Sequence, residues 1–290
     1  MTTTDTPIGG VSDTAYLIAH YRGVESARPD ALFHDPFAKK LAGAKGNAIG
    51  AALNRPTTAW SIAIRTVIID NLILMAIAQG ADTVLNLGSG FDARPYRLDL
   101  PKDLLWIEAD YPDILAHKES VLAVETPRCR LESVSIDLSN DDARREFLSS
   151  LHGRSTNLVV LTEGVVPYLD NEQVGSLADD LYQLVRSSGG SWIVEFLPKR
   201  IHLHRRRKQM KNAPFKFRPD DWYSFFASHG WQQRSIKYLG AEGIRLGRRA
   251  PLPWTTRFAM RAARMFGRDR GRLDRLFGYA VLEPKLDRGS

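Results

Sequence analysis

The hydrophobic and polar positions of this chain follow two alternating periods from about residue 83 onward. Short runs of branched apolar residues are typical of buried strands, and the segments between them space apolar residues as a helix does. We predict seven strands, at 83–87, 104–109, 130–136, 158–161, 191–196, 232–239 and 280–282. Strands that alternate with helices indicate an α/β fold with a mostly parallel seven-stranded sheet and helices on both faces.

Helical spacing also marks the segments between and before the strands. Between them we predict helices at 112–125, 141–151 and 171–186, and a fourth that Asp220 caps and that continues through His229. Before the first strand we predict a helix from Ser12, turns over 25–37, a short helix through Leu41 and a long helix from Pro56 to about Gln79. Residues 1–290 then form one domain, in which 12–80 are a helical extension of a core at 81–198.

The charge of the chain is +7 and is concentrated in two segments. Residues 199–218 carry nine Lys and Arg with no acid, and residues 245–275 carry ten Arg against two Asp. We predict that 199–218, an insertion after the fifth strand, and 243–275 are basic cap segments, the second holding a basic amphipathic helix over 254–268. Such charge suits an anionic substrate, an RNA, an anionic membrane or a solvated face.

Cysteine content and apolar runs indicate the compartment. The single cysteine, Cys129, excludes an internal disulfide framework, so we expect a reducing cytoplasm. The N-terminus lacks a charged-then-apolar signal pattern. The longest apolar run, 67–78, is interrupted by Asp70 and Asn71, so we expect no transmembrane segment.

A glycine turn follows the first predicted strand. Gly88-Ser89-Gly90 lets the backbone turn sharply and approach a ligand that a Cβ would exclude. The dinucleotide fingerprint requires a third glycine, where this chain has Ala93 followed by Arg94, and Asp92 places a carboxylate where a pyrophosphate would lie. The turn therefore favours a nucleoside ligand without phosphates, such as S-adenosylmethionine, over a dinucleotide. A tight turn without any ligand is the alternative.

Polar residues also follow the next three strands, at the edge where α/β proteins bind ligands. Asp110 stands about twenty residues past the glycines, the spacing at which an acid binds ribose hydroxyls. Asp137 with Leu138 follows the third strand, and Glu163 with Gly164 follows the fourth. Asp137 alone is more typical of a helix cap. Together, the four strand ends favour a nucleoside site.

Longer motifs around these residues resemble the leucine carboxyl methyltransferase family, and most closely its bacterial branch of small-molecule, polyketide-type O-methyltransferases. The similarity covers about residues 12–200. In the core, the motifs that carry it are Asn86-Leu-Gly-Ser-Gly-Phe-Asp-Ala-Arg94 with Pro95-Tyr96-Arg97, Glu108-Ala-Asp-Tyr-Pro112 with Lys118, and Thr162-Glu-Gly-Val-Val-Pro-Tyr-Leu169. In the extension, they are Thr14-Ala15, Arg22-Gly-Val-Glu25-Ser26, Leu32-Phe33-x-Asp35-Pro36, and Arg65-Thr66 with Asp70.

The resemblance implies a Rossmann-like class I methyltransferase with S-adenosylmethionine as methyl donor, S-adenosylhomocysteine as product and no metal. By analogy, Arg65 pairs with the methionine carboxylate and Glu163, beside Gly164, lies near the donor's amino group. The resemblance also implies residues that contact the rest of the donor. Gly88, Ser89 and Gly90 would contact the methionine and ribose, and Asp110 and Tyr111 would contact the ribose side. Asp137 and Leu138 would contact the adenine.

The acceptor is less determined than the donor. Because a sulfonium is already a good leaving group, the enzyme mainly positions an oxygen in line with the methyl carbon. A carboxylate acceptor needs no general base, whereas a hydroxyl does. We assign none, because His20 and His34 fit structural roles better. Tyr168, and less directly Tyr21, are candidates to line the acceptor pocket.

We expect the acceptor to be a small acidic metabolite methylated on a carboxylate or hydroxyl oxygen, with no obligate nucleic-acid partner. Three alternatives stay open: an RNA- or protein-directed methyltransferase that uses the basic segments, an inactive nucleoside-binding homologue, and, disfavoured by Asp92, a nicotinamide-dependent oxidoreductase. A homodimer is compatible with the sequence.

Overall fold

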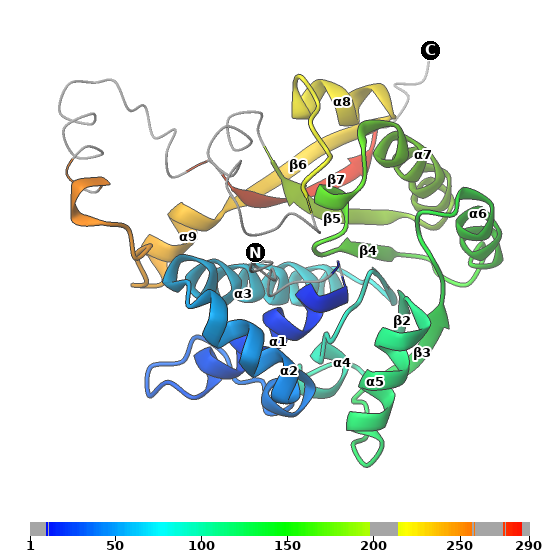
Figure 1. Ribbon diagram of the computed structural model, residues 1–290. Helices are drawn as coiled ribbons and strands as arrows, with labels where there is room; N and C mark the ends of the chain where they lie inside the picture. The colour runs from blue at the N-terminus through cyan, green and yellow to red at the C-terminus, as the bar shows by residue number, and fades with distance from the viewer. Residues whose placement is uncertain are drawn as a thin grey trace, which may run out of the picture.

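The strands of this protein form one seven-stranded sheet in the computed structural model, which describes residues 10, 12–197, 214–256, 258, 275 and 277–285 (Figure 1). The strands are β1 (Thr83–Leu87), β2 (Leu105–Asp110), β3 (Arg130–Ser135), β4 (Leu158–Thr162), β5 (Gly190–Phe196), β6 (Trp231–Tyr238) and β7 (Gly278–Pro284). Their order is β3-β2-β1-β4-β5-β7-β6, and only β7 pairs antiparallel, with both β5 and β6. The α/β fold with a mostly parallel sheet is therefore confirmed.

The helices of the core agree with their predicted ranges to within a few residues. The helices are α1 (Ser12–Ser26), α2 (Ala38–Leu53), α3 (Pro56–Ala78), α4 (Arg94–Arg97), α5 (Pro112–Leu122), α6 (Asp141–Ser150), α7 (Asn171–Ser188), α8 (Trp222–Ser228) and α9 (Leu239–Arg245), with a 3-10 turn at Val166–Tyr168. Most of the predicted helix at 254–268 and most of the insertion at 199–218 lie outside the described residues, and residues 254–256 and 258 of that helix are described as helical.

Two helix ends differ from the prediction. The short helix expected through Leu41 does leave helical geometry close to there, at Gly43 with φ +56°, but a second helical stretch that was not predicted continues α2 to Leu53. The cap of α8 is Asp221 and not Asp220, because the Asp221 carboxylate accepts from the backbone N–H of Ser224 at 2.7 Å. Both outcomes depend on local backbone geometry that composition alone does not determine.

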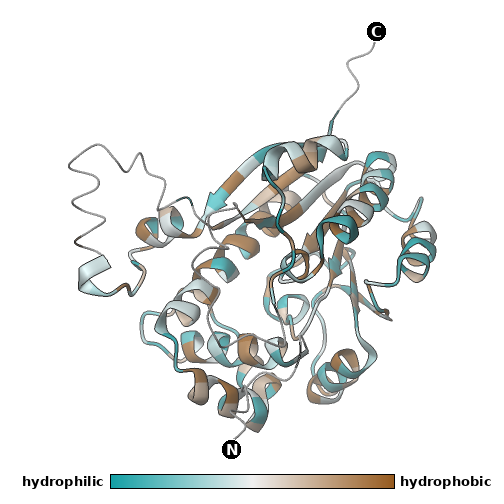
Figure 2. Cartoon of the chain, turned by 45° about the horizontal axis from the view of Figure 1, so that its top comes forward, coloured by the Kyte–Doolittle hydropathy of each residue, from teal (hydrophilic) through white to brown (hydrophobic). Residues whose placement is uncertain are grey.

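Helices cover the sheet on both faces. On one face, residues of α6, α7 and α8 join inward residues of the strands in the largest apolar cluster, around Trp192 and Trp231. On the other face, α3 and α9 pack against residues such as Val84 and Trp106. Figure 2 shows hydrophobic residues along the strands and helices that carry both hydrophobic and hydrophilic residues, as amphipathic helices on a sheet do.

Helix α3 is the one helix in the described part of the chain that is long and apolar enough, by length and composition, to cross a membrane. In the fold it is a core helix: Ile64, Ile68 and Ile69 are buried in the cluster beneath the sheet. Its Asp70 binds Arg94 and Arg97, the two arginines of helix α4.

The register of the parallel strands brings the polar strand ends together. Leu87 of β1 is paired with Ala109 of β2 and with Thr162 of β4. The next residue along each strand therefore lies at the same edge of the sheet, where the carboxyl ends of the strands meet. These residues are Gly88, Asp110 and Glu163. Helices α1 and α2 pack together beside α3 near this edge (Figure 1).

A buried ion pair links β2 to α5 and yields a stability prediction. Lys118 Nζ donates to both carboxylate oxygens of Glu108 at 2.6 and 2.7 Å, and both side chains are almost fully buried. We expect Lys118→Met to lower the free energy of unfolding by about 3–5 kcal/mol, because it leaves a carboxylate buried without its cation. Thermal unfolding measures this as a Tm lower by roughly 6–20 °C, at about 2–4 °C per kcal/mol.

The matched control is the double variant Glu108→Leu/Lys118→Met, which replaces the pair by apolar residues. We expect it to recover most of the lost stability, since no charge stays buried alone. A Lys118→Met protein that melts with the wild type would contradict the prediction.

Candidate active site

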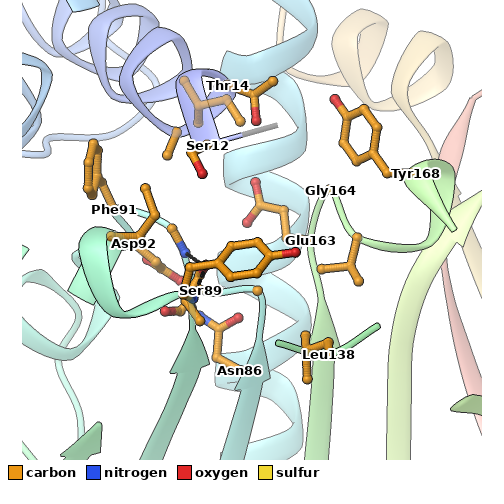
Figure 3. A pocket seen from close by; sticks show the side chains of 18 of the residues that line it. Ser12, Thr14, Asn86, Ser89, Phe91, Asp92, Leu138, Glu163, Gly164 and Tyr168 are labelled. Carbon is orange, nitrogen blue, oxygen red and sulfur yellow. Dashed lines mark hydrogen bonds between the residues drawn. The ribbon is translucent and has the colours of Figure 1, made fainter. Parts of the chain in front are cut away.

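A pocket of about 350 Å³ lies at the sheet edge where β1, β2 and β4 end. Figure 3 shows Ser12 and Thr14 of α1 on one side of it, with Asn86 and Leu138 on the opposite side and Glu163 between them. Ten of the twelve residues predicted for the site line it: Arg65, Gly88, Ser89, Gly90, Asp110, Tyr111, Leu138, Glu163, Gly164 and Tyr168.

The glycine turn is shaped by two positive φ angles. Gly88 has φ +68° and Gly90 has φ +53°, a region that disfavours side chains. A Cβ on Gly88 would lie 2.3 Å from Cγ2 of Val165, so this position also has no room for one. The backbone N–H of Gly90 donates to Oδ2 of Asp110 at 2.6 Å, which ties the turn to the end of β2.

Asp110 is held by the backbone on both oxygens. Its Oδ1 accepts from the N–H of Tyr111 at 2.7 Å, and its Oδ2 accepts from Gly90. Burial raises the pKa of this carboxyl, and the two backbone donors oppose that rise. The arrangement presents a fixed acceptor on the pocket wall.

The other two predicted residues do not line the pocket. Asp137 is exposed, and its Oδ1 accepts from Ser139 Oγ at 2.7 Å and from the Ser139 N–H at 2.9 Å, which lowers its pKa. It thus orders the loop that brings Leu138 and Ser139 to the pocket. Tyr21 is buried in an apolar cluster with Leu17, and its hydroxyl accepts from the N–H of Arg55.

A chain of buried ion pairs reaches the pocket. Arg94, with 1% of its side chain exposed, contacts three carboxylates: Asp70 at 2.6 Å, Asp92 at 2.7 Å and Glu163 at 2.8 Å. Arg65 Nε lies 2.9 Å from the other oxygen of Glu163. Arg94 holds the pKa of the buried Asp92 well below its usual range. The sequence motif contained Arg94, but its spacing did not indicate this role.

Five buried polar atoms of the residues that line the pocket have no hydrogen-bond partner among the described residues. Two of them, Arg22 Nε and Arg65 Nε, lie within ion-pair distance of a carboxylate. The other three are Asn86 Oδ1, Ser89 Oγ and Arg65 Nη2. Buried polar groups are normally paired, so each unpaired one favours a ligand that completes it. Two acceptor-capable oxygens and one guanidinium nitrogen suit a polar ligand that carries both donors and a carboxylate.

A second cavity of about 270 Å³ adjoins the first, and Arg65, Gly164 and Tyr168 line both. It also contacts Glu195 of β5, which the sequence reasoning did not select. The signal was a single acid inside the apolar run Trp192-Ile-Val-Glu-Phe196. Glu195 is 2% exposed, its Oε1 accepts from the N–H of Gly164, and burial raises its pKa to about 8.

The described segments contain no group of three or more His, Cys, Asp or Glu side chains that could hold a metal ion. The single cysteine, Cys129, is a buried free thiol.

The chain matches known proteins over most of its length. The leucine carboxyl methyltransferase family matches residues 15–182. A protein of Parafrankia sp. (strain EAN1pec), named as a candidate S-adenosyl-L-methionine-dependent methyltransferase, is 33% identical over 247 residues, which cover 78% of each chain. A similarly named protein of Streptomyces avermitilis is 30% identical over 244 residues, covering 78% of this chain and 84% of its own.

Solved structures agree on the fold. A DUF574 family protein from Streptomyces avermitilis superposes with a TM-score of 0.56 at 15% identity, covering 94% of this chain and 97% of that one. A candidate methyltransferase from Thermobifida fusca gives a TM-score of 0.53 at 14% identity, with 97% of each chain covered.

The sheet order, the glycine turn and the pocket at the strand ends define a Rossmann-like α/β fold with a ligand site at the carboxyl ends of its strands. The chain belongs to the leucine carboxyl methyltransferase family, and it is an S-adenosylmethionine-dependent methyltransferase.

The buried Glu195 yields a prediction on stability and pH. Its pKa is about 8 in the folded chain against 4.5 for an ordinary glutamate, so between these values the folded state binds one more proton than the unfolded state. Its contribution to stability is therefore present at low pH and lost as the pH rises through 8. Glutamine does not ionise, so only the wild type loses this stability as the pH rises. The difference in free energy of unfolding, Glu195→Gln minus wild type, should therefore increase from pH 5 to pH 9.

Denaturant unfolding at each pH measures this difference, whose slope reaches at most about 1.4 kcal/mol per pH unit. Glu172→Gln, at an exposed position of α7, is the control and should show no such trend. A difference between Glu195→Gln and wild type that stays constant with pH would show that Glu195 ionises normally.

Proposed function

We propose that this enzyme is an O-methyltransferase for a small molecule and that the first pocket binds S-adenosylmethionine. The observation that carries the proposal is the set of unpaired buried atoms of Asn86, Ser89 and Arg65 on one pocket wall, beside the fixed Asp110 carboxylate. A nucleoside that bears an amino acid supplies the carboxylate, ammonium and hydroxyl groups that these residues lack.

The amino-acid end of the donor is assigned to Arg65 and Glu163. Nη2 of Arg65 is free to donate to the methionine carboxylate, a charge-assisted contact. The Glu163 carboxylate lies beside it and suits the donor's ammonium group. The two ends of the zwitterion would thus meet two groups of opposite charge, 2.9 Å apart.

The nucleoside end is assigned to the residues after β2 and β3. Asp110 accepts from the ribose hydroxyls, and the glycine turn lies against the ribose and methionine. Tyr111 and Leu138 line the pocket and offer apolar surface to the adenine. Asp137 orders the loop beneath them, and its carboxylate lies 3.3 Å from the Tyr111 hydroxyl.

The chemistry asked of the protein is mainly positioning, because the sulfonium is a ready leaving group. Tyr168 lines both cavities, so an acceptor beside it would approach the donor from the second cavity. Lys216 lines the first pocket and not the second cavity, so it does not determine the charge of an acceptor in the second cavity. Most of the basic cap segments lie outside the described residues, so they favour neither this acceptor nor the RNA- or protein-directed alternative.

Loss of the Asp110 carboxylate tests the donor site. We expect Asp110→Asn to weaken S-adenosylhomocysteine binding about 10- to 100-fold, because a hydrogen bond to a charged group contributes about 1.5–3 kcal/mol. Titration calorimetry measures the affinity. Asp113→Asn, an exposed acid in the first turn of α5, is the control and should bind as the wild type does.

A thermal-shift measurement with two ligands complements the titration. S-adenosylhomocysteine at a hundred times its Kd should add about 2.7 kcal/mol to wild-type stability, which raises Tm by several degrees. NAD⁺ should produce no shift. A wild-type protein that binds neither compound would contradict the assignment of the first pocket to S-adenosylmethionine, and equal binding by Asp110→Asn would remove Asp110 from the site.

A further inference from the structure

Resting on the proposed function, we infer that the second cavity binds the methyl acceptor, that this acceptor is an aromatic hydroxyl compound, and that Glu195 takes up the hydroxyl proton. This narrows the acceptor from a carboxylate or hydroxyl to a hydroxyl, and it names a catalytic residue where the sequence reasoning assigned none.

The position of the second cavity is the first argument. It shares Arg65, Gly164 and Tyr168 with the pocket assigned to the donor. Figure 3 shows Gly164 and Tyr168 on the side of Glu163 that faces away from Phe91. A ligand in the second cavity therefore meets the donor across this common wall, as in-line transfer requires.

The lining of the second cavity determines the class of ligand. Five aromatic residues contribute to it: Trp60, Tyr168, Phe215, Phe277 and Tyr279. The rings of Tyr168 and Phe215 meet edge to face at 5.4 Å, and the Trp60 indole is fixed by its hydrogen bond to the Arg248 carbonyl at 2.7 Å. Such walls suit a flat aromatic ring, with orientation set by the few polar groups.

Glu195 is the polar group best placed to orient that ring. Its Oε1 is occupied by the N–H of Gly164, whereas its Oε2 is buried without a hydrogen-bond partner among the described residues. An acceptor hydroxyl would supply the missing donor. Because such an atom is otherwise costly to bury, its retention in the cavity points to a ligand.

The charges around Glu195 distinguish a hydroxyl from a carboxylate acceptor. Glu195 interacts electrostatically with Arg65, Glu163 and Tyr279. Tyr168 lines the same cavity. Arg65 is already beside Glu163. With Glu163, Glu195 and the donor's carboxylate already around Arg65, a carboxylate acceptor would add a fourth anionic group, whereas a neutral hydroxyl adds none.

The reaction balances with these groups alone. The acceptor O–H bond gives its proton to Oε2 of Glu195, the oxygen forms a bond to the methyl carbon, and the carbon–sulfur bond breaks. S-adenosylhomocysteine leaves as a neutral thioether, and Glu195 later returns the proton to water. The raised pKa of Glu195, about 8, brings the base closer to a phenol, whose pKa is about 10, than an ordinary glutamate would be.

The test uses 2-naphthol as the hydroxyl probe and 2-naphthoic acid as its carboxylate counterpart. Calorimetry measures the binding of each to the enzyme saturated with S-adenosylhomocysteine, and product mass measures methyl transfer from S-adenosylmethionine between pH 6 and 9. The proteins are wild type, Glu195→Gln, the control Glu172→Gln, and Thr57→Trp, which narrows the second cavity from an exposed position.

We expect the wild type and Glu172→Gln to methylate 2-naphthol in preference to the acid. Glu195→Gln should bind S-adenosylhomocysteine and 2-naphthol within about threefold of wild type, yet lose about 10²- to 10⁴-fold in kcat. The rise of wild-type kcat with pH through about 8 should be absent from Glu195→Gln. Thr57→Trp should weaken 2-naphthol binding and leave S-adenosylhomocysteine affinity unchanged.

Several results would overturn the inference. They are normal S-adenosylhomocysteine binding without 2-naphthol binding or turnover, preferential methylation of the acid, or a Glu195→Gln enzyme as fast as the wild type. Each leaves the donor site standing. Failure of the wild type to bind S-adenosylhomocysteine is a different result, because it would overturn the proposed function as well.

Discussion

The buried Arg94 guanidinium is the group on which the geometry of the site depends. It is linked through Asp70 to Arg97, and through Glu163 to Arg65 at the pocket wall. Arg65 and Asp70 lie on α3, Arg94 and Arg97 lie on α4, and Glu163 directly follows β4. One cation therefore joins three separate parts of the chain. Removing a partner from such a network leaves an uncompensated buried charge, which is costly.

The network continues from the core to the N-terminal extension. Arg97 also approaches Asp35, which binds Arg22 of α1 at 3.0 Å. Arg22 itself lines the first pocket and donates to the backbone carbonyl of Phe91. The alternating acids and bases therefore run from the helix on one side of the pocket to the strand end on the other. This gives a physical reason for the helical extension: it completes the site and does not merely precede the core.

The sequence predicted the parts of the site that follow from local rules. Gly88, Gly90 and Asp110 sit at strand ends, where spacing and the family motif indicate a ligand edge, and the strand register places them together as expected. Asp137 shows where such local rules fail, because an acid at a strand end can cap a loop as well as contact a ligand. In the structure its carboxylate binds Ser139.

Features created by tertiary packing could not be predicted in this way. Tyr21 lies on α1, which also contributes residues to the pocket. The packing of α1 against α2 and α3 directs the Tyr21 side chain into an apolar cluster and not into the pocket. Glu195 looks like an interruption of an apolar strand until the fold brings Gly164 and Arg65 beside it. The pairing of Arg65 with Glu163 likewise joins residues about a hundred positions apart.

The most direct test of this account is the affinity of Arg94→Lys for S-adenosylhomocysteine, measured by titration calorimetry on protein shown to be folded. Arg94 does not line the pocket, and a single ammonium cannot reach three carboxylates as the guanidinium fork does. We predict an affinity at least about tenfold below wild type, equivalent to 1.4 kcal/mol. The control is Arg234→Lys, whose ion pair with Glu283 lies outside the network, and it should bind with near-normal affinity. A folded Arg94→Lys protein that binds as tightly as the wild type would contradict the claim that this ion-pair network positions the site.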